Sequence, residues 1–191
     1  MTTKPKIIAE MCCNHMGDIN IARKMIDAAA VAGADVAKFQ KWHPIEALSQ
    51  AQYNAPHPNP RNSFGNPYGK HREALEFDIR THEYLKDYCD SRAVEYSTSV
   101  FDKTSAKEVC ALNPKVIKVP SQKNLNTEIL DVLCSDFEGE IHISTGMTTN
   151  AQVEKLMNFV DKKTSLSRIV LYCATSSYPC SFDDLYLMRI V

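Results

Sequence analysis

The chain has 191 residues, which is enough for one compact domain with a sizeable core. Its composition, 44% hydrophobic and 24% charged, is ordinary for a globular protein, and a formal net charge of -1 gives no sign of a nucleic-acid or acidic-membrane partner. No apolar run approaches the roughly 20 residues of a membrane-spanning helix. The basic N-terminal residues are not followed by the apolar segment of a signal peptide, so none is expected.

Seven cysteines are scattered along the chain and form no C-x-x-C pair and no spacing typical of a zinc site. An odd number of cysteines within periodic segments indicates reduced, mostly buried thiols in the cytoplasm. Cys12 and Cys13 follow a predicted strand. This pair is interpreted either as a reactive thiol or, with more weight, as small side chains packed near a loop.

The first strand and helix are the clearest elements of the sequence. Residues 7–10 form a short apolar strand, Asp18 is placed to cap a helix over residues 19–32, and a second strand follows at residues 34–39. Later strands are expected at Val94, Val116, Ile141 and Ile169, and later helices at residues 81–91, 103–112, 126–134 and 150–162.

Residues 43–72 differ from the rest because they hold five prolines and little periodicity, which predicts a long loop. A loop of this length inside a compact domain is usually functional, as a lid or a binding loop. The alternative is an ordered decoration with no part in binding.

Six strand–helix periods fit the chain, whereas a closed parallel α/β barrel needs eight strands and typically about 250 residues. The chain is therefore either an open α/β sheet or a barrel that is cut short. Residues 184–191 predict a helix that is just starting. This favours a TIM (β/α)8 barrel truncated after about six units.

Polar side chains follow the predicted strands at the point where each strand ends. Because the carboxyl ends of parallel strands meet on one rim, these groups are expected to form an active site there. The set consists of Glu10, Lys38, Thr98, Lys118, Ser121 and Ser144.

Lys38 and Lys118 are the most suggestive pair, because a lysine in an apolar strand is costly to bury without a partner anion. Two amines on one rim suit a ligand with more than one negative charge, and nearby hydroxyls would add donors for phosphate oxygens. The alternative for each lysine is a strand-end residue that reaches solvent. Glu10 can act as a general base or bind substrate hydroxyls, or it can form a structural ion pair with one of the lysines.

Several short motifs occur together in one order along nearly the whole chain. With them, the sequence resembles the N-acetylneuraminate (sialic acid) synthase family. The matching segments are Ile8-Ala9-Glu10, Asn14-His15, Gly17-Asp18, Ala32-Gly33-Ala34-Asp35, Lys38-Phe39-Gln40, His71-Arg72, Leu75-Glu76-Phe77, Ser97-Thr98, Lys118 with Ser121, Ser144-Thr145-Gly146-Met147 and Thr175-Ser176 with Tyr178-Pro179.

The resemblance implies a cytoplasmic transferase that condenses phosphoenolpyruvate with the aldehyde form of an N-acylated amino sugar. It assigns phosphoenolpyruvate binding to Lys38, Thr98, Lys118, Ser121 and Ser144, and sugar contacts to Glu10 and Tyr178. We expect Glu10 and Lys118 to be the catalytic groups. Residues 1–191 would form the N-terminal part of the barrel, without the family's C-terminal antifreeze-like domain.

The resemblance also implies a dimer and a divalent metal ion, Mn²⁺ or Mg²⁺, whose family ligands would lie beyond Val191. The chain departs from the family pattern at Lys123, where an acidic residue is usual, and at Cys173, where a histidine is usual. Two alternatives therefore stay open: a Schiff-base aldolase with Lys118 as the nucleophile, and a non-catalytic binding module.

Overall fold

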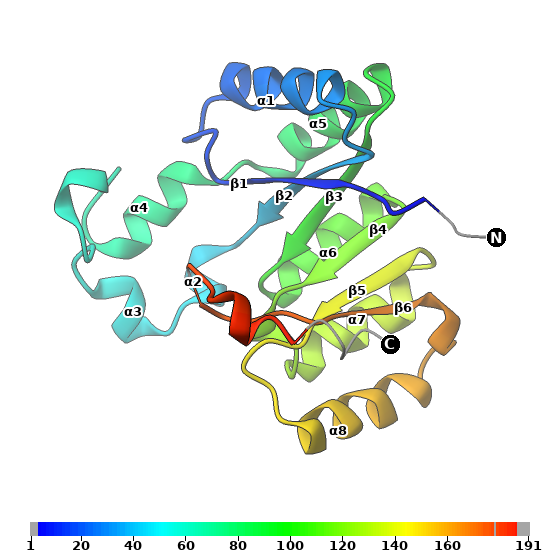
Figure 1. Ribbon diagram of the computed structural model, residues 1–191. Helices are drawn as coiled ribbons and strands as arrows, with labels where there is room; N and C mark the ends of the chain where they lie inside the picture. Colours follow the sequence, from blue (N-terminus) through cyan, green and yellow to red (C-terminus); the bar gives the residue numbers. More distant parts are fainter. Residues whose placement is uncertain (1–3, 178, 187–191) are drawn as a thin grey trace.

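The computed structural model describes residues 4–177 and 179–186. Its centre is one six-stranded sheet in which each strand pairs in parallel with the next one along the chain (Figure 1). The strands are β1 (Ile8–Cys12), β2 (Val36–Lys41), β3 (Glu95–Val100), β4 (Val116–Val119), β5 (Glu140–Ser144) and β6 (Ile169–Tyr172). All the carboxyl ends therefore lie on one edge of the sheet.

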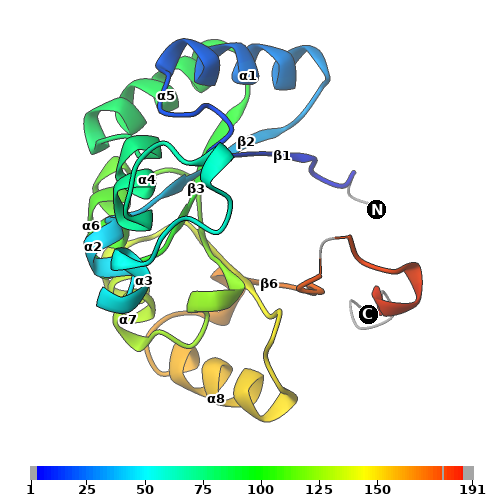
Figure 2. The same ribbon diagram turned by 90° about the vertical axis from the view of Figure 1, so that its left-hand side faces the viewer.

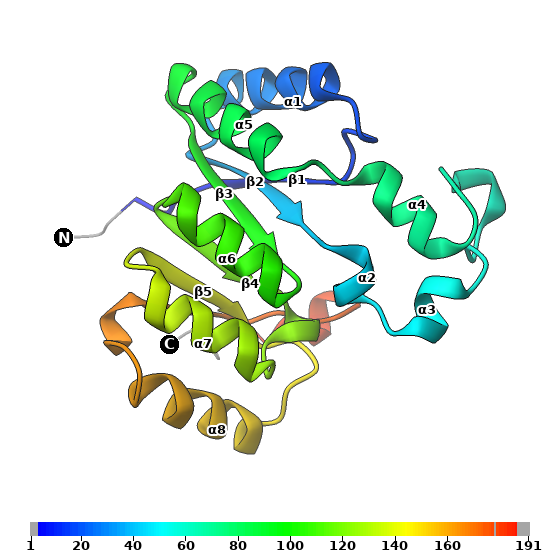
Figure 3. The same cartoon turned by 180° about the vertical axis from the view of Figure 1, so that it is seen from behind.

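The helices between successive strands lie on one side of the curved sheet and leave its concave side open (Figures 2 and 3). They are α1 (Ile19–Val31), α5 (Ile79–Ser91), α6 (Lys103–Leu112), α7 (Thr127–Asp136) and α8 (Asn150–Asp161). Each begins after a polar residue whose side chain accepts a hydrogen bond from a backbone N–H of the first turn. The caps are Asp18, Asp78, Asp102, Asn126 and Thr149.

The hydrophobic core lies between the sheet and these helices, in two clusters. One contains Phe39, Tyr96 and Leu85, and the other contains Ile117 and Leu133, all almost completely buried. The strands alternate between this core and the concave face, because successive side chains of a strand point to opposite sides. The fold class predicted from the sequence is confirmed as a parallel α/β sheet of the TIM-barrel kind, and within the described residues it does not close.

The segment between β2 and α5 is more regular than the sequence predicts. It contains α2 (Pro44–Ala47), α3 (Gln50–Asn54), η1 (Pro60–Asn62) and α4 (Tyr68–Leu75). These helices are too short to show a clear apolar period. The high proline content is then the strongest signal in the sequence, and it predicts a loop. A capping box between Ser49 and Gln52 begins α3, and Gly69 lets α4 approach the Tyr53 ring, where a Cβ atom would lie only 2.2 Å from the ring.

A short 3-10 helix, η4 (Phe182–Asp184), follows β6 near the end of the described residues. The helix expected over residues 184–191 falls mostly on positions outside the described residues. No helix of the described part is long and apolar enough to cross a membrane.

Among the described residues, the two outer strands, β1 and β6, each pair with a single neighbour. On β6, Val170 and Leu171 are 36% and 39% exposed, and unpaired apolar edges favour association between chains. We expect the 191-residue chain to self-associate, and Val170→Lys to shift it toward the monomer. Light scattering over a concentration series measures both.

Val31→Lys is the matched control for this prediction. Val31 is 91% exposed, so the substitution adds the same charge to an exposed apolar position, but it lies on α1 and not on a sheet edge. A wild-type chain that stays monomeric at high concentration would contradict the role of the edges.

Candidate functional site

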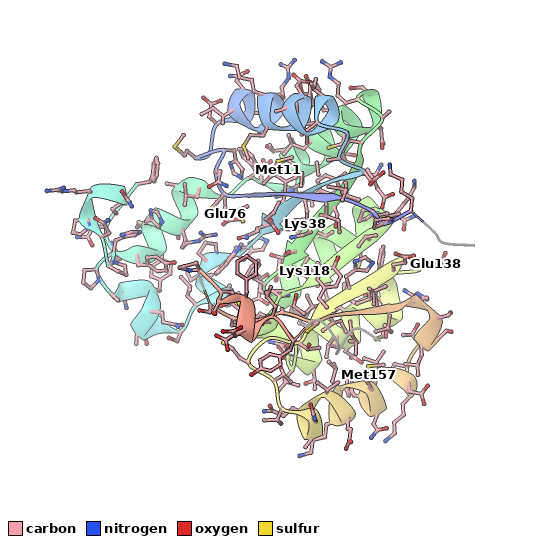
Figure 4. All side chains as sticks on the ribbon, in the orientation of Figure 1. Met11, Lys38, Glu76, Lys118, Glu138 and Met157 are labelled. Atoms are coloured by element: carbon pink, nitrogen blue, oxygen red, sulfur yellow. The ribbon has the colours of Figure 1, made fainter. Side chains whose placement is uncertain are left out.

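Lys38 lies on the concave face of the sheet, near its centre (Figure 4). The neighbouring Phe39 points into the core, so the alternation of β2 places Lys38 on the open side. Its side chain is only 5% exposed, and its ammonium group forms an ion pair with the carboxylate of Glu10 and lies 3.4 Å from Ser99 Oγ. The lysine is therefore a buried cation with a carboxylate partner.

Lys118 reaches the same face from β4, in register with Ser99 of β3. Its Nζ atom lies 5.8 Å from the centre of the Tyr172 ring. Burial lowers the pKa of Lys118, and the nearby positive charge of Lys38 lowers it further. The structure thus brings the two predicted amines together. An anion bound between them would offset the loss of hydration and the repulsion between the two positive charges, so this place favours a negatively charged ligand.

Glu10 lies in the middle of β1, beside these lysines, and its side chain is 41% exposed. One carboxylate oxygen pairs with Lys38, and the other accepts a hydrogen bond from the Cys12 backbone N–H at 3.2 Å. The ion pair expected as the alternative role of Glu10 is present. The exposed part of the carboxylate still faces the open side, where it can meet a ligand.

Thr98 does not lie on this face, so the structure does not bring its hydroxyl together with the two lysines. Tyr96, two residues earlier in β3, forms a 2.8 Å hydrogen bond to His82 of α5, so Tyr96 and Thr98 both point toward the helices. The Thr98 hydroxyl is buried and has no hydrogen-bond partner within the described residues. Ser99 supplies the concave-face hydroxyl of this strand instead.

Ser121 follows β4, and Ser144 is the last residue of β5, so both lie at the carboxyl edge of the sheet. Gly146 is packed tightly there, since a Cβ atom at this position would lie 2.7 Å from Ser121 Oγ and 2.4 Å from Ser176 Oγ. Asn124 holds the turn by donating to the Ser144 carbonyl at 2.8 Å and to Thr148 Oγ1 at 2.6 Å. The absence of a side chain at Gly146 thus brings hydroxyls from two loops together.

A second group on the concave face was not predicted from the sequence. The His142 ring is hydrogen-bonded through Nδ1 to the Tyr172 hydroxyl at 2.7 Å and through Nε2 to Glu140 at 3.0 Å. Burial raises the pKa of Tyr172, and the negative charge of Glu10 adds to that effect. The alternation of side chains along β5 could have predicted the position of His142, because His142 pairs with Lys118 in the register and lies on the same face of the sheet.

Tyr178, predicted to contact the sugar, lies outside the described residues.

His15, in the turn after β1, has a structural role. Its ring stacks on Phe77 at 4.1 Å, and its Nδ1 accepts a hydrogen bond from the Gly17 backbone N–H at 3.1 Å. Burial lowers the pKa of His15 to about 4, and the neighbouring Arg72 charge contributes. Burial also lowers the pKa of His82 to about 3.

Both histidines therefore fold in the neutral form, and their folded pKa values lie below the unfolded value of about 6.5. The unfolded chain binds more protons between these values, so the free energy of unfolding should fall as pH falls from about 6.5 toward 4. We expect NMR titration of His15 and His82 to give midpoints below pH 5, with matching loss of stability in urea unfolding. Midpoints near 6.5 would contradict the buried neutral state.

The Cys12 thiol lies beside Glu10 and Lys38 but is poorly suited to be a nucleophile. Burial raises its pKa to about 11, and Glu10 adds to the increase. Because the thiolate is the reactive form, the structure favours the packing role over the reactive one.

A buried cluster fixes the long segment to the end of β2. The Arg72 guanidinium pairs with Glu76 at 2.6 Å and lies 4.2 Å from the centre of the Trp42 ring, while Glu76 accepts a hydrogen bond from the Trp42 backbone N–H at 3.1 Å. The Trp42 ring also stacks on the Phe101 ring, with 3.9 Å between the ring centres. Burial raises the pKa of Glu76 to about 7, against the opposing effect of Arg72. Trp42 is thereby held rigidly at the rim.

The parallel sheet with polar and charged groups at its carboxyl edge defines a fold of the α/β-barrel class. The model of the NeuB family matches residues 25–191, and the chain belongs to that family. This confirms the resemblance found from the sequence motifs.

Curated relatives agree with the assignment. The chain is 29% identical over 185 residues to the N,N'-diacetyllegionaminic acid synthase of Campylobacter jejuni, and 32% identical over 188 residues to the N-acetylneuraminate-9-phosphate synthase of Drosophila melanogaster. Each match covers 96% of this chain, but 55% and 49% of the relative. The chain thus spans about half the length of these relatives.

A solved structure has the same arrangement of strands and helices. The sialic acid synthetase of Leptospira borgpetersenii, crystallised in complex with citrate, superimposes with a TM-score of 0.80 at 25% sequence identity. The match covers 98% of this chain and 60% of that one.

Proposed function

We propose that the concave face binds phosphoenolpyruvate and takes part in its condensation with the aldehyde form of an N-acylated amino sugar, giving a nonulosonic acid. The observation that carries the proposal is the pair of neighbouring amines of Lys38, which is buried, and Lys118, which is partly buried. Phosphoenolpyruvate carries a phosphate and a carboxylate, so two cations at one site match its charge.

In this proposal Lys38 and Lys118 hold the anionic groups of phosphoenolpyruvate, and Ser99, Ser121 and Ser144 donate to its oxygens. The methylene carbon attacks the aldehyde carbon, water adds to the resulting cation, and phosphate leaves with cleavage of the C–O bond. Glu10 is placed to act as the base for the attacking water or to bind a sugar hydroxyl.

A divalent metal ion, Mn²⁺ or Mg²⁺, remains part of the proposal for the family reaction. Within residues 4–177 and 179–186, no group of three or more His, Cys, Asp or Glu side chains is arranged to hold a metal ion. The donors described here therefore do not fit a complete metal site, and no step of the proposal passes through one. A cytoplasmic homodimer is likewise proposed on the family resemblance.

The proposal is tested by calorimetric titration of the chain with phosphoenolpyruvate, with and without Mn²⁺. Product formation is followed in parallel with N-acetylmannosamine and with N-acetylmannosamine 6-phosphate as acceptors. Binding together with turnover supports the synthase function, whereas binding without turnover supports the non-catalytic binding module. Absence of binding in both conditions would overturn the proposal.

A Schiff-base aldolase is the second candidate, and the lowered pKa of Lys118 favours it, because a neutral amine can attack a carbonyl. Borohydride reduction in the presence of pyruvate would trap an adduct on Lys118 if this candidate is correct. Mass spectrometry of the peptide that contains Lys118 detects the added mass. An unmodified peptide excludes the imine.

A further inference from the structure

A cavity of about 520 Å³ lies beside the candidate site, between the long segment after β2 and the short helix η2 (Ser121–Lys123) after β4. The strands that lead into it are those that carry Lys38 and Lys118. Its volume is within the range of about 300–1,000 Å³ that is typical of small-molecule sites. The cavity therefore lies where a second substrate could approach a ligand bound at Lys38 and Lys118.

The walls of the cavity are mostly apolar and aromatic, with Trp42 and Tyr68 among them. They are held in place by packing, since Trp42 is fixed between Phe101 and Arg72, and Tyr68 stacks on His71 at 5.5 Å. Walls of this kind pack well against the C–H faces of a sugar ring. The side-chain amide of Gln122 adds a polar group.

Lys123 is the only charged residue among those that line the cavity, all of which belong to the described part of the chain. Its ammonium group donates to the Ala47 carbonyl at 2.9 Å, and it forms no salt bridge with any described residue. An ammonium group has three N–H donors, so the hydrogen bond to Ala47 leaves two of them for a ligand. The contact with Ala47 fixes the position of the amine without neutralising its charge.

We propose that this cavity binds the acceptor sugar and that Lys123 selects acceptors that carry a negative charge. The anionic group is a phosphate ester or a carboxylate, either of which forms a charge-assisted hydrogen bond with an ammonium group. This inference rests on the proposed synthase function, since it assigns the acceptor class for the same site.

The test is calorimetric titration of the chain with three probes: N-acetylmannosamine 6-phosphate, N-acetylmannosaminuronate and neutral N-acetylmannosamine. The wild type should bind at least one anionic probe at least tenfold more tightly than the neutral sugar. The stronger of the two anionic probes identifies the group as phosphate or carboxylate. Equal affinity for all three, or no binding of any, would overturn the proposal.

Variants at Lys123 separate charge selection from support of the long segment. Lys123→Gln should remove the preference for anionic probes, Lys123→Glu should reverse it, and Lys123→Arg should retain it. Lys155→Gln, which removes an exposed charge from α8, is the matched control and should have no effect. Equal weakening of the neutral and anionic probes in Lys123→Gln would show that Lys123 only supports the cavity wall, and would contradict the proposal.

Phosphoenolpyruvate affinity distinguishes failure of this inference from failure of the proposed function. Lys123→Gln should leave phosphoenolpyruvate binding unchanged, because that ligand is assigned to Lys38 and Lys118. A chain that binds phosphoenolpyruvate but does not prefer anionic acceptors would refute the role of Lys123 alone. A chain that binds neither ligand would refute both.

Discussion

Lys118→Ala should weaken the binding of phosphoenolpyruvate at least a hundredfold. The ammonium group is partly buried near Lys38, in an environment of reduced polarity, where a charge pair with a bound anion is stronger than in water. Loss of one partner of a buried ion pair costs on the order of 3–5 kcal/mol, and a hundredfold loss of affinity corresponds to about 2.7 kcal/mol. Isothermal titration calorimetry measures the change directly.

The control for this variant is Lys115→Ala. Lys115 lies one residue before β4, and its side chain is 80% exposed, so its removal takes away the same charge at the opposite end of the strand. Thermal unfolding of both variants checks the fold. Because Lys118 is desolvated and faces another cation, its removal should not destabilise the unliganded protein. Unchanged affinity in Lys118→Ala would refute the assignment of the site.

Glu10→Ala should lower the free energy of unfolding by about 3 kcal/mol, at the lower end of the cost for breaking a buried ion pair. The Lys38 side chain is 5% exposed and would lose its carboxylate partner, while the 41% exposure of Glu10 limits the loss through solvent screening. Urea unfolding at neutral pH measures the effect. Phosphoenolpyruvate should restore part of the stability, since its anionic groups can take the place of the missing carboxylate.

The double variant Glu10→Ala with Lys38→Met tests the cause. It removes both charges, so its stability should lie above that of Glu10→Ala alone. Glu83→Ala removes an exposed carboxylate from α5 and should have little effect. If Glu10→Ala is as stable as the wild type, the ion pair between Glu10 and Lys38 does not stabilise the fold.

The alternation of strands and helices could be predicted because it depends on local signals. Apolar runs mark all six strands, and Asp18 and Asn126 begin helices close to the expected positions. The segment after β2 could not be predicted in the same way. Its helices are short and depend on contacts such as the fit of Gly69 against Tyr53, which lie outside any local pattern.

The charged groups of the candidate site can be recognised in the sequence, whereas its hydroxyl groups can be recognised only in part. Lys38 and Lys118 are unusual in apolar strands, so the sequence alone marks them out. Ser97, Thr98 and Ser99 form a run of three hydroxyls, and the residues themselves do not show which of them faces the ligand. The bond between Tyr96 and His82 fixes that orientation, and it joins residues from a strand and the helix before it.

The sequence by itself thus determined the class of fold, the family resemblance and the two cationic strand positions, because each depends on residue type and local order. Only the tertiary structure decided that Ser99 and not Thr98 lies beside Lys38, and that His142 is hydrogen-bonded to Tyr172. It also decided that Lys123 lines a cavity and that its ammonium group forms no salt bridge with a described residue. These facts depend on the register between strands and on the packing of a long segment against β4. Both bring together residues that are far apart along the chain, and a local sequence pattern contains no information about the distance between such residues in space.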